Sequence, residues 1–458
     1  MAEDLLRLPT LRATAVEELD DGSYLVHADI PKAVAFCTHC GSSQSYGHGI
    51  QEQRVVDVPN HGRRTIIALT RRRYRCMACR KTFFEAAPDL DNKRLATARL
   101  VAHVRKHCLR RTFADLAREV GLDDQTIRNI FDDLVKDLEK ATQFETPRLL
   151  GLDEIKVVGR SRAVVTNVEE NTLFDMLVDR NKATLMAYFR QMRDRDKVEV
   201  LTMDMWSVYA QVADKCFPGV PVVIDRFHVE RMANDALEKV RKAVRKGLPT
   251  RQRLKLKDDR HLLLASFDRL SAEQRDTCAV WFEVYPQLGQ AHAAKEGFAA
   301  IYRSASRAAA ERAFDVWRDR LAPEVVPYFR DLVHAVMNRR RDVFNYFDHR
   351  ITNAYTESVN NLIKLENRMG RGYSFEVLRA RMLYDQQATK AGSTSVRKKA
   401  ARPRQRPQPR PDTGLYTRVT PEMLRPAPRP TVEYVDEIVC YGAHIPTLVK
   451  LLEQGHFE

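Results

Sequence analysis

Long apolar runs are missing from this sequence of 458 residues. None reaches the ~18 residues that a membrane-spanning helix needs, so we expect no membrane partner. The first residues lack a basic start followed by an apolar stretch, which argues against a secretory signal and predicts a cytoplasmic protein. Hydrophobic residues still make up 44% of the chain, and a chain of this length predicts two to four domains with real cores.

Acidic residues are in the minority, with 61 Asp and Glu against 76 Lys and Arg, and the formal net charge is +15. Such an excess favours a polyanionic partner, and nucleic acid is the first candidate. About half of it lies in residues 396–431, where ten basic residues accompany two acidic ones. This Arg/Pro-rich composition predicts a disordered basic linker over residues 391–431. A short ordered element is expected at 432–458.

Cysteine is uncommon, but four of the eight cysteines form two Cys-x-x-Cys pairs. In a cytoplasmic protein such pairs favour a metal over a disulfide. Cys37 and Cys40 lie in CTHCG, and Cys76 and Cys79 follow the basic end of a predicted strand, TIIALTRRRY. Four thiolates match the tetrahedral coordination of structural Zn²⁺. We therefore predict a β-rich zinc-ribbon domain over residues 1–90, with a redox pair as the alternative.

Residues 91–147 change to a helical pattern that predicts a helix-turn-helix DNA-binding domain. The segment FADLAREV fits a first helix, Gly121 fits the turn, and Asp123 or Asp124 fits the cap of the second helix. Five side chains near the start of that helix are expected to face a DNA groove: Asp124, Gln125, Thr126, Arg128 and Asn129. The alternative is an ordinary helical hairpin in a core.

The next part of the chain is rich in strand patterns. Residues 148–229 give three strands, a helix, a strand, a helix and a strand, which predicts the first part of a ribonuclease-H-like catalytic core. In that fold the first and fourth strands lie side by side. Residues 230–345 contain few strand signals and predict an all-helical insertion. Residues 346–390 return to helix and complete the core, so the predicted fold class is multidomain α+β.

Three acidic residues on separate elements of this core are candidate metal ligands. Asp153 and Asp204 end the apolar runs LLGLD and VLTMD, and Glu357 lies in ITNAYTESVNN. An acidic residue is costly inside a core unless it is paired or binds a metal, whereas at a strand end it can face a cleft. Three carboxylates can hold two Mg²⁺ (or Mn²⁺) ions ~3.5–4 Å apart for phosphodiester cleavage. In this prediction Asp153 bridges the ions and the other two flank them.

Further polar residues are assigned supporting roles. Lys364 lies seven residues after Glu357, nearly two helical turns, so it is expected to face the same way and contact a DNA phosphate. The alternative is a solvated helix face. Asp225 ends another apolar run, and His228 could orient it, contact DNA or form a structural hydrogen bond. Two neighbours could also reach DNA: Asn360 and Asn361.

Taken in order, these motifs resemble a bacterial insertion-sequence transposase of the ISL3 type. The likeness covers nearly all of residues 11–390 and rests on CTHCG, LLGLDEIKV, LTMDMWSVY, VVIDRFHV and YFDHRITNAYTESVNNLIKLENRMGRGY. It implies a DDE transposase with Asp153, Asp204 and Glu357 as its catalytic triad. VVIDRFHV matches an Asp-x-x-His element that several transposase families carry. The Arg/Pro-rich tail departs from the family pattern.

The resemblance implies double-stranded DNA as the partner, both as terminal inverted repeats and as target DNA. The repeats would be cleaved, and the freed 3′-OH would then attack the target. Two ends must be brought together, which implies a homodimer or a larger synaptic assembly in a bacterial, nucleoid-associated setting. A catalytically silent DNA-binding regulator derived from a transposase is the main alternative, and an unrelated nuclease or resolvase is a weaker one. The intact set of acidic residues favours the enzyme.

Overall fold

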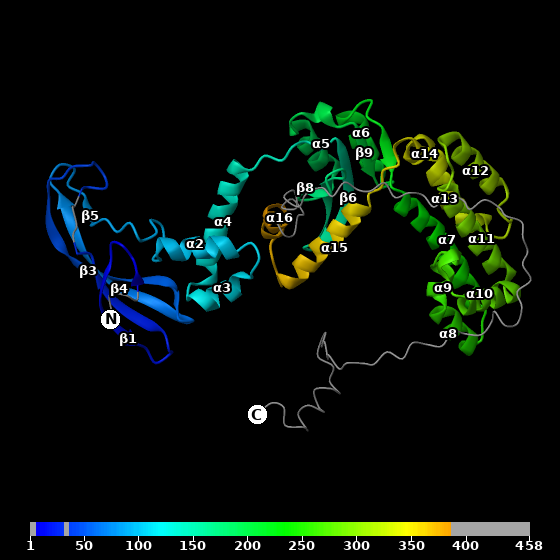
Figure 1. Ribbon diagram of the computed structural model, residues 1–458. Coiled ribbons are helices and arrows are strands. Elements are labelled where there is room, and N and C mark those ends of the chain that lie inside the picture. Colours follow the sequence, from blue (N-terminus) through cyan, green and yellow to red (C-terminus); the bar gives the residue numbers. More distant parts are fainter. Residues whose placement is uncertain (1–5, 32–35, 386–458) are drawn as a thin grey trace, which may run out of the picture. The chain divides into compact units, whose positions relative to one another are not determined.

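The computed structural model describes residues 6–31 and 36–385 (Figure 1). The predicted linker at 391–431 and the predicted element at 432–458 lie outside the described residues. Within the part that is described, no helix combines the length and the apolar character needed to cross a bilayer.

The amino-terminal part contains a five-stranded sheet. Its strands are β1 (Arg12–Glu18), β2 (Tyr24–Asp29), β3 (Ser45–Asn60), β4 (Arg63–Cys76) and β5 (Thr82–Phe84). Strands β1 and β2 form an antiparallel hairpin that turns through Gly22, whose φ of 77° favours glycine. In the antiparallel β3–β4 pair, Ser45 lies opposite Cys76, so the segments that carry the two cysteine pairs meet at this end.

Three helices follow, and they have the helix-turn-helix arrangement predicted. They are α2 (Ala98–His107), α3 (Phe113–Val120) and α4 (Asp124–Ala141). The turn after α3 passes through Gly121 at a φ of 79°, and the Asp123 side chain caps α4 by accepting from the Thr126 N–H. Helix α4 continues to Ala141, with Ile127, Ile130 and Phe131 on its buried face.

A second five-stranded sheet has the order β10-β9-β6-β7-β8. Its strands are β6 (Leu149–Val157), β7 (Arg160–Asn167), β8 (Thr172–Met176), β9 (Val200–Met203) and β10 (Val222–Ile224), with α5 (Lys182–Gln191) and α6 (Ser207–Cys216) between them in the chain. The parallel pairing of β6 with β9 confirms that the first and fourth strands are neighbours. Alternate residues of β6 face opposite sides, as a strand requires. Leu150 and Leu152 pack with α5 and α6, whereas Ile155 and Val157 pack with the last helices.

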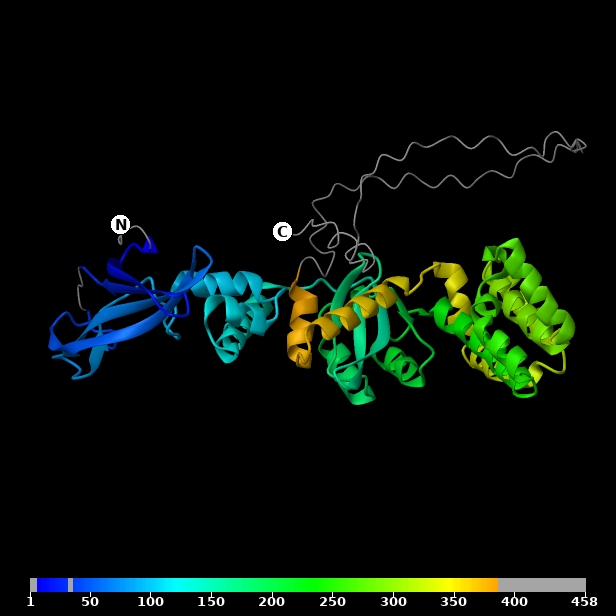
Figure 2. The same cartoon turned by 90° about the horizontal axis from the view of Figure 1, so that it is seen from below.

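Those last helices are α15 (Ala354–Met369) and α16 (Phe375–Tyr384). Helix α15 lies across one face of the sheet, against β6 and β7 (Figure 1, Figure 2). Val359 and Ile363 of α15 are buried with Ile155 and Val157 of β6. This packing brings the segment that contains Glu357 to the face of β6 that also carries Asp153.

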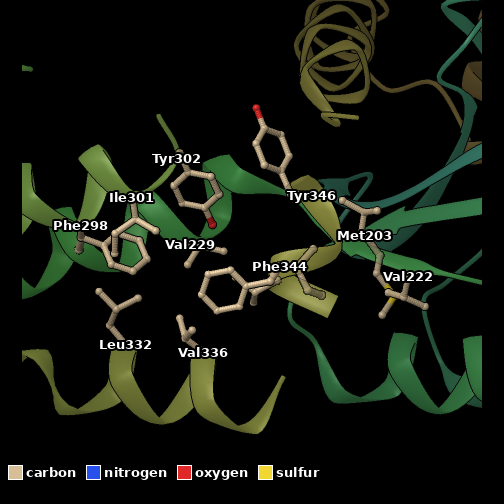
Figure 3. Close-up of a cluster of buried hydrophobic side chains, with 14 of the residues drawn as sticks. Met203, Val222, Val229, Phe298, Ile301, Tyr302, Leu332, Val336, Phe344 and Tyr346 are labelled. Carbon is tan, nitrogen blue, oxygen red and sulfur yellow. The ribbon is translucent and has the colours of Figure 1, made fainter. Parts of the chain in front are cut away.

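The residues between β10 and α15, all of them described, form helices only. These are α7 (Arg226–Lys246), α8 (Thr250–Asp258), α9 (Arg260–Leu264), α10 (Ala272–Val284), α11 (Pro286–Ile301), α12 (Arg307–Asp319), α13 (Val326–Asn338) and α14 (Arg340–His349). One hydrophobic cluster joins them to the sheet, and Figure 3 shows Met203 and Val222 of the sheet beside Phe344. Asn345 of α14 also donates to the Val222 carbonyl at 2.7 Å. The helical segment therefore begins and ends at β10.

Candidate active site

Three neighbouring strands of the second sheet each end an apolar run in an aspartate. Leu152 of β6 pairs with Met203 of β9, which in turn pairs with Ile224 of β10. The residues that follow these three in the chain are Asp153, Asp204 and Asp225. Because the three strands are parallel and paired in this register, the three aspartates lie at the same level of the sheet, where β9 and β10 end and β6 continues to Val157. Asp225, predicted only as an auxiliary residue, therefore lies at the same level as the two predicted ligands.

Asp153 and Asp204 are joined by His228 in a potential metal site. Ligand atoms of these three residues lie within 4.8 Å of one another. The Nε2 atom of His228 is 4.0 Å from Asp153 Oδ1, and its Nδ1 atom is 3.4 Å from Asp225 Oδ2. Glu357 lies outside this set of three in the conformation described. Two carboxylates and an imidazole suit a divalent cation such as Mn²⁺, and added water ligands would suit Mg²⁺.

The carboxylates of this cluster lie in surroundings that disfavour their charge. Burial raises the pKa of Asp153 to about 7; His228 opposes this rise, and Asp204, Asp225 and Glu357 increase it by repulsion. Burial also raises the pKa of Asp204 and of Glu357. Contact with the Asp225 carboxylate raises the pKa of His228. A bound cation would favour the ionised form of these carboxylates, because its positive charge would offset their burial and their mutual repulsion.

Helix α15 meets the sheet through a row of buried polar side chains. The row consists of Asn353, Thr356 and Asn360. Thr356 shares a hydrogen bond of 2.7 Å with Thr166 of β7 and also donates to Asn353 Oδ1. The Asn353 N–H donates to Asp225 Oδ1 at 3.2 Å. These bonds fix the first turn of α15, which is the turn that carries Glu357.

Gly151 provides the space for this row. A Cβ atom at position 151 would lie 2.7 Å from Asn353 Oδ1, 2.9 Å from Val168 Cγ2 and closer still to Thr166 Oγ1. Real Cβ atoms do not approach other atoms so closely, so a larger residue would push α15 away from β6. The glycine thus sets how near Glu357 lies to the strand that carries Asp153.

Asn360 is buried against Asp153, so the expectation that it reaches DNA is wrong. Its Nδ2 atom donates to Asp153 Oδ2 at 2.9 Å and to the Glu154 carbonyl at 3.3 Å. The other oxygen of that carboxylate, Oδ1, accepts from the Glu154 N–H at 2.7 Å. Tyr209 donates its hydroxyl to the Asp153 carbonyl at 3.1 Å. Asn361, in contrast, is exposed.

Glu357 and Lys364 share α15, as predicted, with Glu357 half-buried and Lys364 exposed. The rise in the pKa of Glu357, caused first by burial, is opposed in part by Lys364. The two side chains therefore act on each other electrostatically. Their assigned roles, as metal ligand and as phosphate contact, stay predictions.

Two residues beside Asp204 were not found from the sequence. Arg180 lies over the ring of Trp206 at 4.2 Å and pairs with Glu154. The backbone N–H of Trp206 donates to Asp204 Oδ1 at 2.8 Å. Trp206 directly follows the LTMDM motif, which was a usable signal, but Arg180 comes from a loop of no distinctive pattern.

The four predicted cysteines converge in the amino-terminal sheet. Ligand atoms of Cys37, Cys40, Cys76 and Cys79 lie within 4.8 Å of one another. The Sγ atoms of Cys37 and Cys79 are 3.5 Å apart, and those of Cys40 and Cys76 are 3.6 Å apart. These separations exceed the ~2.05 Å of a disulfide, so the thiols are free. Four thiols in one cluster fit a tetrahedral Zn²⁺ ion.

The predicted DNA-facing residues of α4 are arranged unequally. Asp124, Gln125 and Asn129 are exposed, and Gln125 donates to the Asn129 side chain at 3.0 Å. Thr126 is half-buried and bonds to Asp123 in the helix cap. Arg128 is half-buried and lies 5.5 Å from the centre of the Phe113 ring. Asp124, Gln125 and Asn129 are therefore the most accessible of the five to a DNA groove.

Comparison with known proteins gives three family matches along the chain. A model for DDE transposases of the ISL3 type matches residues 150–382. A model described as the zinc-finger of transposase IS204/IS1001/IS1096/IS1165 matches residues 33–79, and one described as the helix-turn-helix domain of transposase family ISL3 matches residues 85–135. The transposase for insertion sequence element IS1001 from Bordetella parapertussis is 21% identical over 350 residues, covering 74% of this chain and 86% of that protein.

Proposed function

The chain belongs to the ISL3 family of transposases, and from this premise we propose that it is a metal-dependent DNA transposase of the DDE type. It would bind the terminal inverted repeats of an insertion sequence, cut DNA strands there and join the freed 3′-OH to target DNA. The observation that carries this proposal is the clustering of Asp153, Asp204 and His228 at one sheet edge. Helix α15, with Glu357, is hydrogen-bonded to the same edge.

In this proposal Asp153, Asp204 and Glu357 hold two Mg²⁺ or Mn²⁺ ions. The buried, mutually repelling carboxylates support such a site, because burial raises the pKa of all three. When bound, the ions supply activation of the attacking oxygen and stabilisation of the leaving oxygen. Glu357 lies outside the group formed by Asp153, Asp204 and His228 in the conformation described, so its side chain must move to join the other two ligands.

The chain's own residues would hold and orient these ligands. Asn360 and the Glu154 N–H fix the two oxygens of Asp153, and the Trp206 N–H fixes one oxygen of Asp204. His228 lies between Asp153 and Asp225, with its Nε2 atom toward the first and its Nδ1 atom toward the second. Lys364, on the exposed side of α15, would contact a DNA phosphate beside the ions.

The domain organisation is proposed as predicted from the sequence. A zinc ribbon (residues 1–90) and a helix-turn-helix domain (91–147) would bind the repeats. A ribonuclease-H-like core (148–229 and 346–390) would cut DNA, and it is interrupted by an all-helical insertion (230–345). The zinc-ribbon match and the four-cysteine cluster support a structural Zn²⁺ ion. The active form would be a homodimer or larger assembly on the bacterial nucleoid, because two ends must be joined.

The decisive experiment uses the DNA that flanks the gene. Matching inverted repeats there would supply the substrate, and the protein would be incubated with labelled repeat DNA and Mg²⁺ or Mn²⁺. We expect strand cleavage followed by strand-transfer joints. Asp204→Asn should abolish both while leaving repeat binding nearly intact. Asp214→Asn makes the same substitution on the exposed surface of α6 and should behave as wild type.

Any other result of this experiment would assign the protein a different function. Repeat binding without any nicks in the wild type would support a catalytically silent regulator. Nicks without joints would support a nuclease. Loss of binding together with cleavage in Asp204→Asn would mean that this residue is structural.

A further inference from the structure

One segment of the helical region is strongly basic. Residues 239–257, at the end of α7 and in α8, contain nine Lys or Arg and no Asp or Glu. Residues 396–431 contain a further ten basic residues and two acidic ones. Outside these two segments 57 basic and 59 acidic residues remain, so the rest of the chain is close to neutral. The positive charge of the protein is therefore concentrated in two segments of the sequence, and residues 239–257 lie within the part that the structure describes.

Most of the charges on this segment have no acidic partner. Lys239 pairs with Asp331, and Lys242 and Arg241 pair with Glu238. Among the described residues, no ion pair forms with the other six, which are Arg245, Lys246, Arg251, Arg253, Lys255 and Lys257. We call these six the basic surface. All of them are exposed except Arg245, which is half-buried.

The two helices that carry the basic surface pack against each other. Helix α8 contacts α7 (Figure 1), and its single buried residue, Leu256, is fully covered. The buried Arg241 of α7 donates to the Leu256 carbonyl at 3.0 Å and is itself bound by Glu238. Cations from both helices are thus fixed relative to one another. A fixed array of charges needs less ordering when a polyanion binds than flexible side chains on a loop would need.

The spacing of these charges works against the helices that carry them. Arg251 and Lys255 are four residues apart, as are Arg253 and Lys257, and like charges at this spacing repel and disfavour a helix. A face selected only for solubility would mix both signs. The cost is recovered when an extended polyanion lies against the helix, because its charges then neutralise both members of each pair.

We propose that the basic surface binds the phosphate backbone of double-stranded DNA without regard to sequence, as a contact separate from the helix-turn-helix. This rests on the proposed function, which makes DNA the polyanion that the protein meets. A membrane surface fits poorly, because Leu254 is the single large exposed apolar side chain in residues 239–257. The tail at 396–431 is itself basic and cannot neutralise the surface. An acidic protein is the competing partner, and the test below distinguishes it.

The test compares two variants of the full-length protein, each with four positive charges removed. In the first, Arg251, Arg253, Lys255 and Lys257 are changed to Gln. In the matched control, four exposed arginines elsewhere in the helical segment are changed to Gln: Arg312, Arg320, Arg330 and Arg341. Both variants keep the basic tail, so its contribution to binding cancels. Thermal unfolding of each variant verifies the fold, and these surface changes should leave it intact.

The measurement is binding to a duplex that lacks any repeat sequence, at salt concentrations from 50 to 200 mM. Each phosphate contact adds about 0.9 to the slope of log K against log salt, so losing four contacts should lower the slope by about 3.6. Across this fourfold range the wild type should lose about 150-fold more affinity than the first variant. The control should keep the wild-type slope to within about one contact.

Equal slopes for the first variant and wild type would overturn the proposal and leave an acidic protein as the partner. Equal losses in both variants would also overturn it, because the effect would then follow total charge and not this surface. The assay requires no cleavage, so a catalytically silent chain would still give the predicted slopes. The cleavage assay therefore tests the proposed chemistry, and the salt dependence of binding tests this inference separately.

Discussion

Replacing Asn360 by alanine tests whether α15 orients the aspartate at the centre of the site. The Asn360 amide donates to Asp153 Oδ2 at 2.9 Å, and both residues are buried. The substitution removes this donor and gives the carboxylate freedom to rotate. Oδ1 keeps its bond from the Glu154 N–H, so β6 itself should stay in place.

The expected size of the effect follows from the geometry. A hydrogen bond to a charged group contributes about 1.5–3 kcal/mol, and each 1.4 kcal/mol corresponds to about a factor of ten. Removing a residue that orients a metal ligand costs about 10- to 100-fold in metal affinity or activity, which agrees with that range. We therefore expect Asn360→Ala to weaken Mn²⁺ binding about 10- to 100-fold. Cleavage at limiting metal should fall by a similar factor, and higher metal should restore part of it.

The assay measures Mn²⁺ binding by electron paramagnetic resonance and cleavage of repeat DNA over a range of metal concentrations. Asn361→Ala is the matched control for Mn²⁺ binding without DNA, because it removes the same side chain from an exposed position on the same helix. Repeat binding and thermal unfolding should show that both variants are folded. A folded Asn360→Ala protein with wild-type metal affinity would refute the orienting role. Metal binding is measured without DNA, so this result does not depend on the reaction.

Three further predictions concern zinc, packing and pH. Cys76→Ser should release zinc and unfold the amino-terminal sheet, since structural zinc supplies folding free energy; metal analysis checks this, and a zinc-free wild type would contradict it. Gly151→Ala should lower the free energy of unfolding by about 1–3 kcal/mol through overpacking, measured by urea titration, whereas Gly247→Ala, where a Cβ would make one ordinary contact 3.8 Å from the Val244 carbonyl oxygen, should not. Burial lowers the pKa of His292 to about 4. The unfolded chain therefore takes up a proton below about pH 6.5 that the folded chain excludes, and stability should fall by about 1.4 kcal/mol per pH unit towards pH 4. His292→Phe should remove most of that slope, and an unchanged slope would mean that another group causes it.

The three aspartates were found because their signal is local, an apolar run that stops at an acidic residue. This pattern marked the ends of β9 and β10, which Asp204 and Asp225 directly follow, whereas Asp153 lies in the middle of β6, which continues to Val157. Their common level was not predictable, because it depends on the pairing of Leu152 with Met203 and of Met203 with Ile224. Pairing register is a property of the assembled sheet.

The role of Asn360 was not predictable for a different reason. Residues 352–361 are mostly polar, and a polar helix normally faces solvent. Here three polar residues of that stretch are buried because Gly151 and Thr166 leave room for them and supply partners. The spacing of Asn353, Thr356 and Asn360 places them on one face, but spacing alone does not tell which face is buried. The partner of Asn360 lies 207 residues away in the chain.

The distance between Glu357 and the aspartates is fixed by how the helical segment closes. The chain leaves the sheet at Asp225, where α7 begins, and returns through α14, whose Asn345 donates to the Val222 carbonyl of β10. The next residues bring the Asn353 N–H back to Asp225. More than a hundred residues of helix thus begin and end at a single short strand, so they lengthen the chain without moving α15 from β6. Any change that frees α14 from β10 should therefore displace Glu357 and Asn360 together, and the cluster around Asp153 would lose its ligand and its orienting amide in one step.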